Sequence, residues 1–332
     1  MLNFCTLYNS KYASRGLAMY YSLKKHCPAF HLYIFAFDNI LVDILHRMHL
    51  ENVTVITLKE FEDPELLRIK PTRTAGEYCW TCSSSTILYC LEHYNIDHCT
   101  YIDSDLYFYA DPSVLVEEMG DDDVLITEHR YSPQFNSAIS NGKYCVQFMT
   151  FKNNDNGLKI LKWWRNACIE WCYARYEDGK FGDQKYLDDW TTRFSGVHEL
   201  QHLGGGVAPW NMQQYTFANC GDKVIGTEIS TGKTFPLIFF HFHYLHCTRW
   251  SWFIEINLTH YPLPKSVKQC IYGSHLKVLK RSFHEIQKQD KNTDGLAIQS
   301  DTYHNVWQFA KHLIRKFFIE RDNRVYYWIN LK

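Results

Sequence analysis

The stretch Tyr101-Ile102-Asp103-Ser104-Asp105-Leu106-Tyr107-Phe108 begins as an apolar strand and ends in two carboxylates separated by one residue. In an extended backbone, residues two apart point to the same side, so Asp103 and Asp105 can reach one small cation together. Two like charges that leave water need a positive partner between them. Oxygen ligands suit Mg²⁺ or Mn²⁺, which complete their shell with substrate phosphates. The alternative interpretation is an acidic turn after a strand.

Strand and helix patterns alternate along the first hundred residues. This alternation predicts an α/β fold with a mostly parallel sheet and helices on both faces. Ligands of such sheets bind at the carboxyl ends of the strands, where the two aspartates lie. The predicted strands cover residues 2–8, 30–37, 53–58 and 98–103, and the predicted helices cover residues 12–25 and 77–94.

The pattern is less regular after Asp105. Strands are predicted at residues 121–128, 144–152 and 235–244, with a Trp-rich helix at 157–176. Beyond Tyr261 the chain reads as helical and basic. We therefore expect one domain over residues 1–260, with a first half at 1–105 and a second half at 106–260. A helical extension over 261–332 would follow it.

Composition excludes several classes of protein. Hydrophobic residues make up 46% of the 332 residues, and the net charge of −1 makes a nucleic-acid partner improbable. The N-terminus lacks a basic segment followed by an apolar run, so we expect a cytoplasmic protein. The 12 cysteines are then best interpreted as reduced thiols. Cys79-x-x-Cys82 has no second pair with zinc-site spacing.

Three further motifs carry polar side chains. His241 and His243 share one face of the predicted strand at 235–244, and either could complete an acidic metal site or simply be a hydrogen-bonded residue at the edge of the core. Asp183 and Gln184 follow a glycine-flanked loop, where Asp183 could also cap a helix. The run Gly204-Gly205-Gly206-Val207-Ala208-Pro209-Trp210-Asn211 predicts a loop that passes close to another group, or a tight structural turn.

The order of these motifs resembles that of GT-A nucleotide-sugar glycosyltransferases, in particular the family-8-like enzymes. That family includes bacterial lipooligosaccharide galactosyltransferases and glycogenin. Four shorter runs also resemble a bacterial group found with capsule and O-antigen genes. These runs are Asn141-Gly142-Lys143-Tyr144, Trp163-Trp164-Arg165, Asp183-Gln184-Lys185-Tyr186-Leu187 and Ala208-Pro209-Trp210-Asn211.

This resemblance, which covers residues 1–250, implies a role for each motif. Asp103, Asp105 and His241 would bind Mn²⁺ or Mg²⁺ against the donor diphosphate. Asp183 and Gln184 would lie at the donor sugar and the reacting carbon. Contacts to the donor nucleotide would come from Thr6, Leu7, Tyr8 and Asn9, from Tyr12 and Asp38, and from Ser104, Gly205 and Arg249.

The sequence also departs from the family pattern. H-x-x-G-x-x-K-P-W is replaced by a run from His241 to Trp250 in which Tyr244 stands for Gly and Cys247 for Lys. Arg249 could supply the missing cation. The helix before the aspartate pair reads Trp80-Thr81-Cys82-Ser83, without the Arg that many of these enzymes carry there.

The expected function is transfer of a sugar, with retention of configuration, from a nucleoside diphosphate donor such as a UDP-sugar. The expected acceptor is a glycan or glycolipid of bacterial surface polysaccharide synthesis. One alternative is a catalytically inactive sugar-binding or scaffold protein. Another is a metal-dependent nucleotidyltransferase, which would need a Gly-rich basic loop after the first strand, whereas this chain has Asn9-Ser10-Lys11-Tyr12.

The C-terminal segment 303–332 has six Lys or Arg and two acidic residues. A basic amphipathic helix is predicted from apolar residues that recur at helical spacing, namely Trp307, Ala310, Leu313, Ile314 and Phe317. Such a helix could rest on the anionic inner face of a membrane and bring the enzyme to a lipid-linked acceptor. It could equally dock on the catalytic domain.

Overall fold

A computed structural model describes residues 1–250, 253–259, 261–298, 307, 311 and 326–330. Its strands run over Leu2–Tyr8 (β1), Phe30–Ala36 (β2), Val53–Thr57 (β3), His98–Ile102 (β4), Leu106–Phe108 (β5), Val124–Glu128 (β6), Tyr144–Lys152 (β7), Val197–Glu199 (β8), Tyr215–Cys220 (β9), Lys223–Glu228 (β10), Thr234–Pro236 (β11), Phe239–His241 (β12), His246–Trp250 (β13), Phe253–Asn257 (β14) and Tyr326–Asn330 (β15).

The helices lie between and after these strands. They run over Ala13–His26 (α1), Asn39–Met48 (α2), Leu58–Phe61 (α3), Pro64–Ile69 (α4), Ala75–His93 (α5), Ser113–Glu118 (α6), Ala138–Asn141 (α7), Asp155–Glu170 (α8), Trp190–Arg193 (α9), Lys265–Val267 (α10) and Gly273–Gln289 (α11). Of the helices in the described part of the chain, none combines the length and apolar composition that a membrane span needs.

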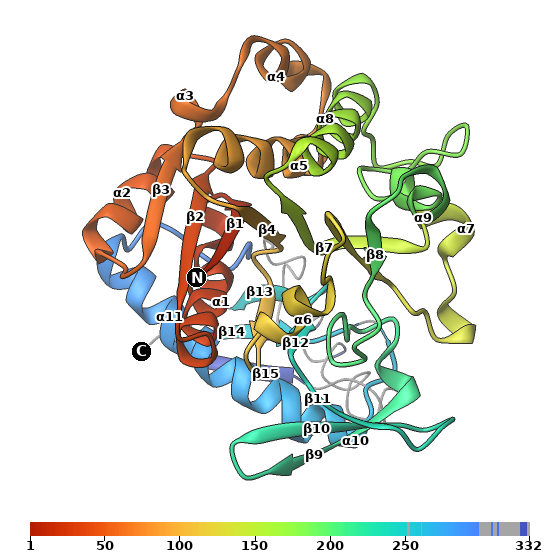
Figure 1. Cartoon of the computed structure of the whole chain (residues 1–332). Helices are drawn as coiled ribbons and strands as arrows, with labels where there is room; N and C mark the ends of the chain where they lie inside the picture. The colour runs from red at the N-terminus through yellow and green to blue at the C-terminus, as the bar shows by residue number, and fades with distance from the viewer. Residues whose placement is uncertain (251–252, 260, 299–306, 308–310, 312–325, 331–332) are drawn as a thin grey trace.

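The central sheet has seven strands in the order β3-β2-β1-β4-β7-β6-β8 (Figure 1). Strands β1 to β4 are mutually parallel, and β7 runs antiparallel to both β4 and β6. The predicted α/β class, with a mostly parallel sheet flanked by helices, is confirmed. The strand order reverses between β1 and β4, and such a switch point opens a crevice at the carboxyl ends of the two strands.

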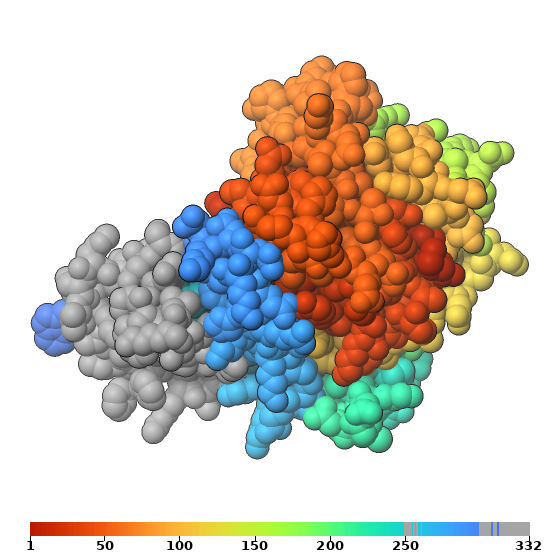
Figure 2. Space-filling model, turned by 90° about the vertical axis from the view of Figure 1, so that its left-hand side faces the viewer, coloured from red at the N-terminus to blue at the C-terminus, as the bar shows by residue number. Residues whose placement is uncertain are grey.

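The two faces of the sheet carry separate apolar cores because alternate residues of each strand point to opposite sides. Cys5 and Leu7 of β1 pack with α5 and α8 on one face. Phe4 and Tyr8 pack with α1 and α2 on the other. Figure 2 shows α11 lying against the N-terminal half of the chain, where it contacts α1. The switch point therefore lies in a sheet that is covered on both sides.

The sequence-based boundaries of β1 and β7 are confirmed, and several others shift. The predicted strand at 235–244 divides into β11 and β12, and the chain turns after His241 through Tyr244, whose φ is +64°. Helix α8 ends at Glu170 rather than at residue 176 because Trp171 is extended. The sequence analysis also missed helices α2 to α4 and the β9–β10 hairpin.

Part of the predicted C-terminal helical extension is wrong. Residues Tyr326–Asn330 form β15, which pairs antiparallel with β14. The run Tyr326-Tyr327-Trp328-Ile329 is aromatic and β-branched, a composition that favours a strand once a partner strand is present. The predicted basic amphipathic helix falls, apart from Trp307 and Lys311, outside the described residues.

A third apolar core lies between β12, β13, β14 and α11, and it contains a buried imidazole. His275 is 2% exposed, and its ring stacks on Phe242 at a centroid distance of 3.6 Å. Burial, and then the charge of Arg15, lower the pKa of His275 to about 3. The folded chain therefore holds this side chain neutral.

We predict that His275 makes the fold sensitive to mild acid. Below about pH 6.5 the unfolded chain takes up a proton that the folded chain refuses, so stability falls as the pH falls. Between pH 7 and pH 5, protonation of this one group in the unfolded chain should lower the free energy of unfolding by about 2 kcal/mol. Urea unfolding at both pH values measures this loss. Between pH 7 and pH 5, the free energy of unfolding of His275→Leu should fall by about 2 kcal/mol less than that of the parent chain. His46→Leu, at an exposed position, is the control, and an unchanged loss in His275→Leu would contradict the prediction.

Candidate metal centre

Two carboxylates and one imidazole converge at the switch point of the sheet. Asp103 and Asp105 follow β4, and His241 ends β12, which pairs with β5 in a register that places His241 opposite Leu106. His241 Nε2 lies 3.0 Å from Asp105 Oδ1 and 3.7 Å from Asp103 Oδ2. The three side chains are grouped closely enough to hold one ion. The predicted proximity of these residues is thus observed, and His241 rather than His243 completes the group.

Gln147 orients the imidazole of His241. Its Oε1 lies 2.8 Å from His241 Nδ1 and can only accept, so Nδ1 carries the proton. Burial opposes the charged ring, but the charge and hydrogen bond of Asp105 outweigh it and raise the pKa of His241, so Nε2 also carries a proton. An ion would take the place of that proton on Nε2, which faces the carboxylates. A neighbour that fixes the tautomer in this way is typical of metal-binding histidines. The sequence analysis missed Gln147, because nothing in the spacing of β7 points to His241.

The electrostatics of the group fit a cation. Burial and the charge of Asp105 raise the pKa of Asp103 to about 6, against the opposing charge of His241. Burial also acts against ionised Asp105, but the charge and hydrogen bond of His241 outweigh it and hold the pKa of Asp105 below its usual range. The side chains of Asp103 and Asp105 are 30% and 17% exposed, so an ion from solvent can reach them.

Asp183 lies near this group and caps no helix. It is 5% exposed, and its backbone oxygen accepts a hydrogen bond from the Trp164 indole at 2.9 Å. Burial, and then the charge of Asp103, raise the pKa of Asp183 to about 7. Ser83 of α5 lies beside it. The neighbouring Gln184 instead donates its amide to the Asn141 carbonyl oxygen at 2.7 Å.

Helix α5 and helix α1 supply side chains that the sequence analysis missed. Cys79 of α5 lies within electrostatic reach of Asp103: burial and the charge of Asp103 raise the pKa of its thiol to about 12. Arg15 of α1 is 6% exposed and donates to the backbone oxygens of Leu245 and Leu296, at 2.7 and 3.2 Å. Its charge is among those that favour ionised Asp105.

Arg15 also lies against the position where the family pattern has a lysine. Its guanidinium contacts the thiol of Cys247, which is buried. The side chain of Arg249, the cation that the sequence analysis considered, lies outside the described residues. A cation therefore lies beside the motif, but it comes from the first helix of the chain.

The predicted nucleotide-binding residues are placed differently from one another. Thr6, Leu7 and Tyr8 belong to β1 and are buried, so the predicted loop begins only at Asn9. Asn9 accepts a hydrogen bond from the Lys11 backbone and begins a 3-10 turn. The turn ends at Tyr12, whose ring lies under the Arg15 guanidinium at 4.4 Å.

Asp38 and Gly205 have structural partners. The carboxylate of Asp38 accepts from the Leu41 backbone at the start of α2, and from the backbone and hydroxyl of Ser10. It thus ties the end of β2 to the turn after β1. A Cβ on Gly205 would meet Leu115 and Leu200, which accounts for this glycine without any ligand. Ser104 is buried between the two aspartates.

The Ala208-Pro209-Trp210-Asn211 turn packs against the imidazole of His241. Trp210 is buried, and its indole donates to the His129 backbone oxygen at 2.9 Å. Its ring meets that of His241 edge to face, with centroids 5.3 Å apart. The backbone of His241 in turn donates to the Val207 oxygen at 2.9 Å. This motif therefore positions His241.

The fold and this site define an α/β protein with a candidate divalent-cation site at the switch point of its sheet. No family model matches the chain. It is 31% identical over 291 residues to the uncharacterized protein YfnD of Bacillus subtilis (strain 168), covering 86% of this chain and 91% of YfnD. It is 30% identical over 247 residues to YfnF of the same strain, covering 72% and 80%. The chain therefore belongs to the family of YfnD and YfnF.

Solved structures with a similar fold include three glycosyltransferases. The galactosyltransferase LgtC, in complex with donor and acceptor sugar analogs, has a TM-score of 0.49 at 11% identity and covers 84% of this chain and 96% of its own. GlyE of Streptococcus pneumoniae TIGR4 has a TM-score of 0.43 at 13% identity, covering 64% and 48%. Mouse xyloside xylosyltransferase 1 has a TM-score of 0.41 at 13% identity, covering 60% and 84%. At these scores the likenesses by themselves assign no function to the chain.

We predict that Gln147 sets the metal affinity of the site. Gln147→Leu removes the acceptor for His241 Nδ1 and should weaken Mn²⁺ binding about 10- to 100-fold. Gln147→Glu, which keeps an acceptor, should retain binding. Thr150→Val, on the same strand, is the control for packing. Titration of free Mn²⁺ by electron paramagnetic resonance measures the affinity, and equal binding by Gln147→Leu and the parent chain would contradict the role.

Proposed function

We propose that this chain is a metal-dependent glycosyltransferase of the GT-A type. It moves a sugar from a nucleoside diphosphate donor, such as a UDP-sugar, to a glycan or lipid-linked glycan. The observation that carries this proposal is the convergence of Asp103, Asp105 and His241 at the switch point of the sheet. The order of motifs along the sequence supports it.

The donor atoms suit Mn²⁺ or Mg²⁺. Two carboxylates and an imidazole nitrogen leave several coordination positions for phosphate oxygens, and the imidazole favours Mn²⁺. When bound, the ion supplies Lewis-acid stabilisation of the departing diphosphate. Arg15 adds a fixed positive charge close to Asp105, which suits a ligand that brings more negative charge than the ion neutralises.

Asp183 is proposed to act on the donor sugar. Breaking the bond between the anomeric carbon and the diphosphate develops positive charge on the ring, and a nearby carboxylate stabilises that charge. Asp183 is buried close to Asp103, so it can face a sugar whose phosphates lie at the metal centre. Gln184 is proposed to hold the loop at the reacting carbon through its bond to Asn141. Transfer with retention of configuration is part of the proposal.

The turn after β1 does not favour the nucleotidyltransferase alternative. Residues Ser10–Tyr12 form a short 3-10 helix capped by the Asn9 side chain. A triphosphate is usually held by a glycine-rich loop whose backbone amides point at the phosphates. Here the Ser10 amide is already bonded to Asp38 at 2.9 Å. The turn thus offers no phosphate-binding loop of that kind.

We predict metal-dependent turnover of a nucleotide sugar. The purified chain, given Mn²⁺ and a panel of nucleotide sugars, should release nucleoside diphosphate from at least one donor, and a chelator should stop the release. Asp105→Asn should lose at least about a hundredfold in kcat/KM, because one ligand and one charge are gone. Asp97→Asn, at the exposed opposite end of β4, should behave as the parent chain.

The outcomes separate the three functions. Release of pyrophosphate from a nucleoside triphosphate would indicate a nucleotidyltransferase. Sugar binding without turnover of any donor would indicate an inactive binding protein. Full activity in chelator, or in Asp105→Asn, would exclude the proposed metal centre.

We further predict that Asp183 acts mainly in the transition state. Asp183→Asn should lower kcat about a hundredfold while changing the affinity for the nucleoside diphosphate less than threefold. Asp188→Asn, in the same loop but bonded to Lys143 and Lys185, is the control for loop structure. Single-turnover kinetics and isothermal titration separate the two effects, and normal turnover by Asp183→Asn would remove Asp183 from the mechanism.

A further inference from the structure

Tyr244 carries a large ring at a backbone position that suits glycine. It lies three residues after His241, in the turn that follows β12, and its φ is +64°. A Cβ atom in this left-handed region crowds the backbone. Asparagine and aspartate offset that crowding with local hydrogen bonds, whereas a tyrosine hydroxyl lies too far from its own backbone to do so. Strained residues of this kind cluster at binding and catalytic sites.

The ring of Tyr244 is only partly covered. The residue is 44% exposed, although its neighbours Phe242 and Leu245 are buried. Packing therefore accounts for only part of the ring, and a glycine would make the same turn without strain. The strain and the exposed ring together indicate a role that glycine could not fill.

A series of ring contacts joins Tyr244 to the metal centre. The ring centroid of His243 lies 5.6 Å from that of His241 and 4.1 Å from that of Tyr244. The ring of Tyr244 also lies 6.3 Å from that of Tyr261, and Tyr261 meets Phe135 edge to face at 4.9 Å. We call Tyr244, Tyr261 and Phe135 the aromatic row. It begins two ring contacts away from a candidate metal ligand.

The aromatic row leads from the metal centre toward β6 and β7. Phe135 belongs to the turn between these two strands, and Tyr261 packs against the small apolar group around Trp210. In the sheet, β7 and β6 lie on one side of β4, and β1 lies on the other. The turn after β1, where the nucleotide of the proposed donor would lie, is therefore on the opposite side of β4 from Phe135. The row flanks the side that is left for an acceptor.

The chemistry of the row suits a sugar ring. One face of a pyranose carries C–H groups with a slight positive charge, and these match the negative face of an aromatic ring. A phosphate, by contrast, is bound by cations and by backbone amides. The row consists of three uncharged aromatic side chains, and Tyr244 leaves part of its ring exposed.

We propose that Tyr244 determines acceptor specificity by stacking on the pyranose ring that receives the transferred sugar. Tyr261 and Phe135 extend the same surface toward the next sugar of the glycan. This inference rests on the proposed function and adds the class of acceptor to it, namely a glycan whose terminal sugar presents a C–H face. Stacking of this kind binds the acceptor equally before and during transfer, so it should act on the acceptor KM more than on kcat.

The test measures transfer by the full-length chain, with Mn²⁺ and the nucleotide sugar that it turns over. The acceptors are methyl glycosides of hexoses and N-acetylhexosamines, together with the disaccharides built from them. Tyr244→Leu should raise the acceptor KM at least about tenfold, and Tyr244→Phe, which keeps the ring, should stay within about threefold of the parent chain. Phe135→Leu should weaken the disaccharides and spare the monosaccharides.

A glycine variant separates binding from structure. Tyr244→Gly removes the ring and the strain together, so it should raise the acceptor KM as Tyr244→Leu does, while Tm changes by less than about 3 °C. His49→Gly is the matched control, at an exposed position after α2 whose φ is +47°. It should leave the acceptor KM unchanged. A large loss of Tm in Tyr244→Gly, with kcat and KM altered together, would show a structural role only.

The remaining outcomes each have one meaning. An unchanged acceptor KM in Tyr244→Leu would overturn the inference. A loss of affinity for UDP in that variant, measured by isothermal titration without acceptor, would assign the ring to the nucleotide instead. Turnover of a donor with no transfer to any glycoside would exclude a sugar acceptor of this class.

Failure of the proposed function is recognised separately, because no nucleotide sugar would then be turned over. Saturation-transfer NMR of the methyl glycosides, recorded with Mg²⁺ and UDP present, tests the aromatic row in that case. Signals from sugar C–H protons that are lost in Tyr244→Leu would support stacking. Absence of such signals with the parent chain would overturn it.

Discussion

The repulsion between Asp103 and Asp105 is the constraint on which this site depends. The two carboxylates lie close together just after a buried strand, and burial makes their mutual repulsion more costly than it would be in water. His241, which lies on a separate strand and is oriented by Gln147, supplies a positive charge beside them. Arg15 adds a second positive charge that acts on Asp105. In the proposed function, a divalent ion would take the place of the His241 proton, and a diphosphate ligand would bring negative charge to the positive charge that remains.

The charged residues of the site are held in place by buried strands and helices. Strands β1 and β4 lie side by side at the switch point, and helix α5 covers them with apolar and thiol side chains. The same helix presents Cys79 and Ser83 toward the acidic group. Helix α5 therefore contributes both to the apolar core and to the surroundings of the acidic group.

Several residues of the predicted site have structural partners of their own. Gly205 is small because Leu115 and Leu200 fill the space beside it. Trp210 packs its ring against His241 and satisfies its indole on a backbone oxygen. Asp38 holds the turn after β1. A polar or glycine motif near a site can hold the ligand-binding residues in place or contact the ligand itself. Its spacing along the chain does not distinguish these two roles.

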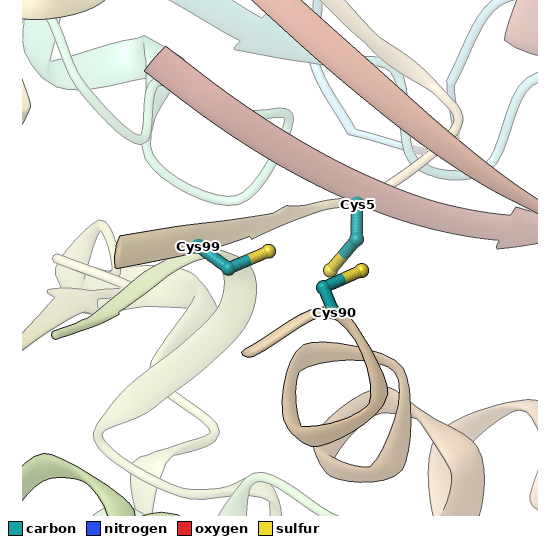
Figure 3. Close-up of side chains that lie close together, drawn as sticks. All are labelled: Cys5, Cys90 and Cys99. Atoms are coloured by element: carbon teal, nitrogen blue, oxygen red, sulfur yellow. The ribbon is translucent and has the colours of Figure 1, made fainter. Parts of the chain in front are cut away.

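The sequence by itself determined the α/β class, the extents of β1 and β7, and the acidic pair at a strand end. Those features depend on local periodicity, which the order of residues records directly. Only the tertiary structure decided that His241 rather than His243 meets the carboxylates, that Asp183 caps no helix, and that Arg15 lies against Cys247. It also brought Cys5 on β1 close to Cys90 on α5 (Figure 3). These contacts join segments that lie far apart in the sequence, and they follow from strand order and helix packing, which no local pattern encodes.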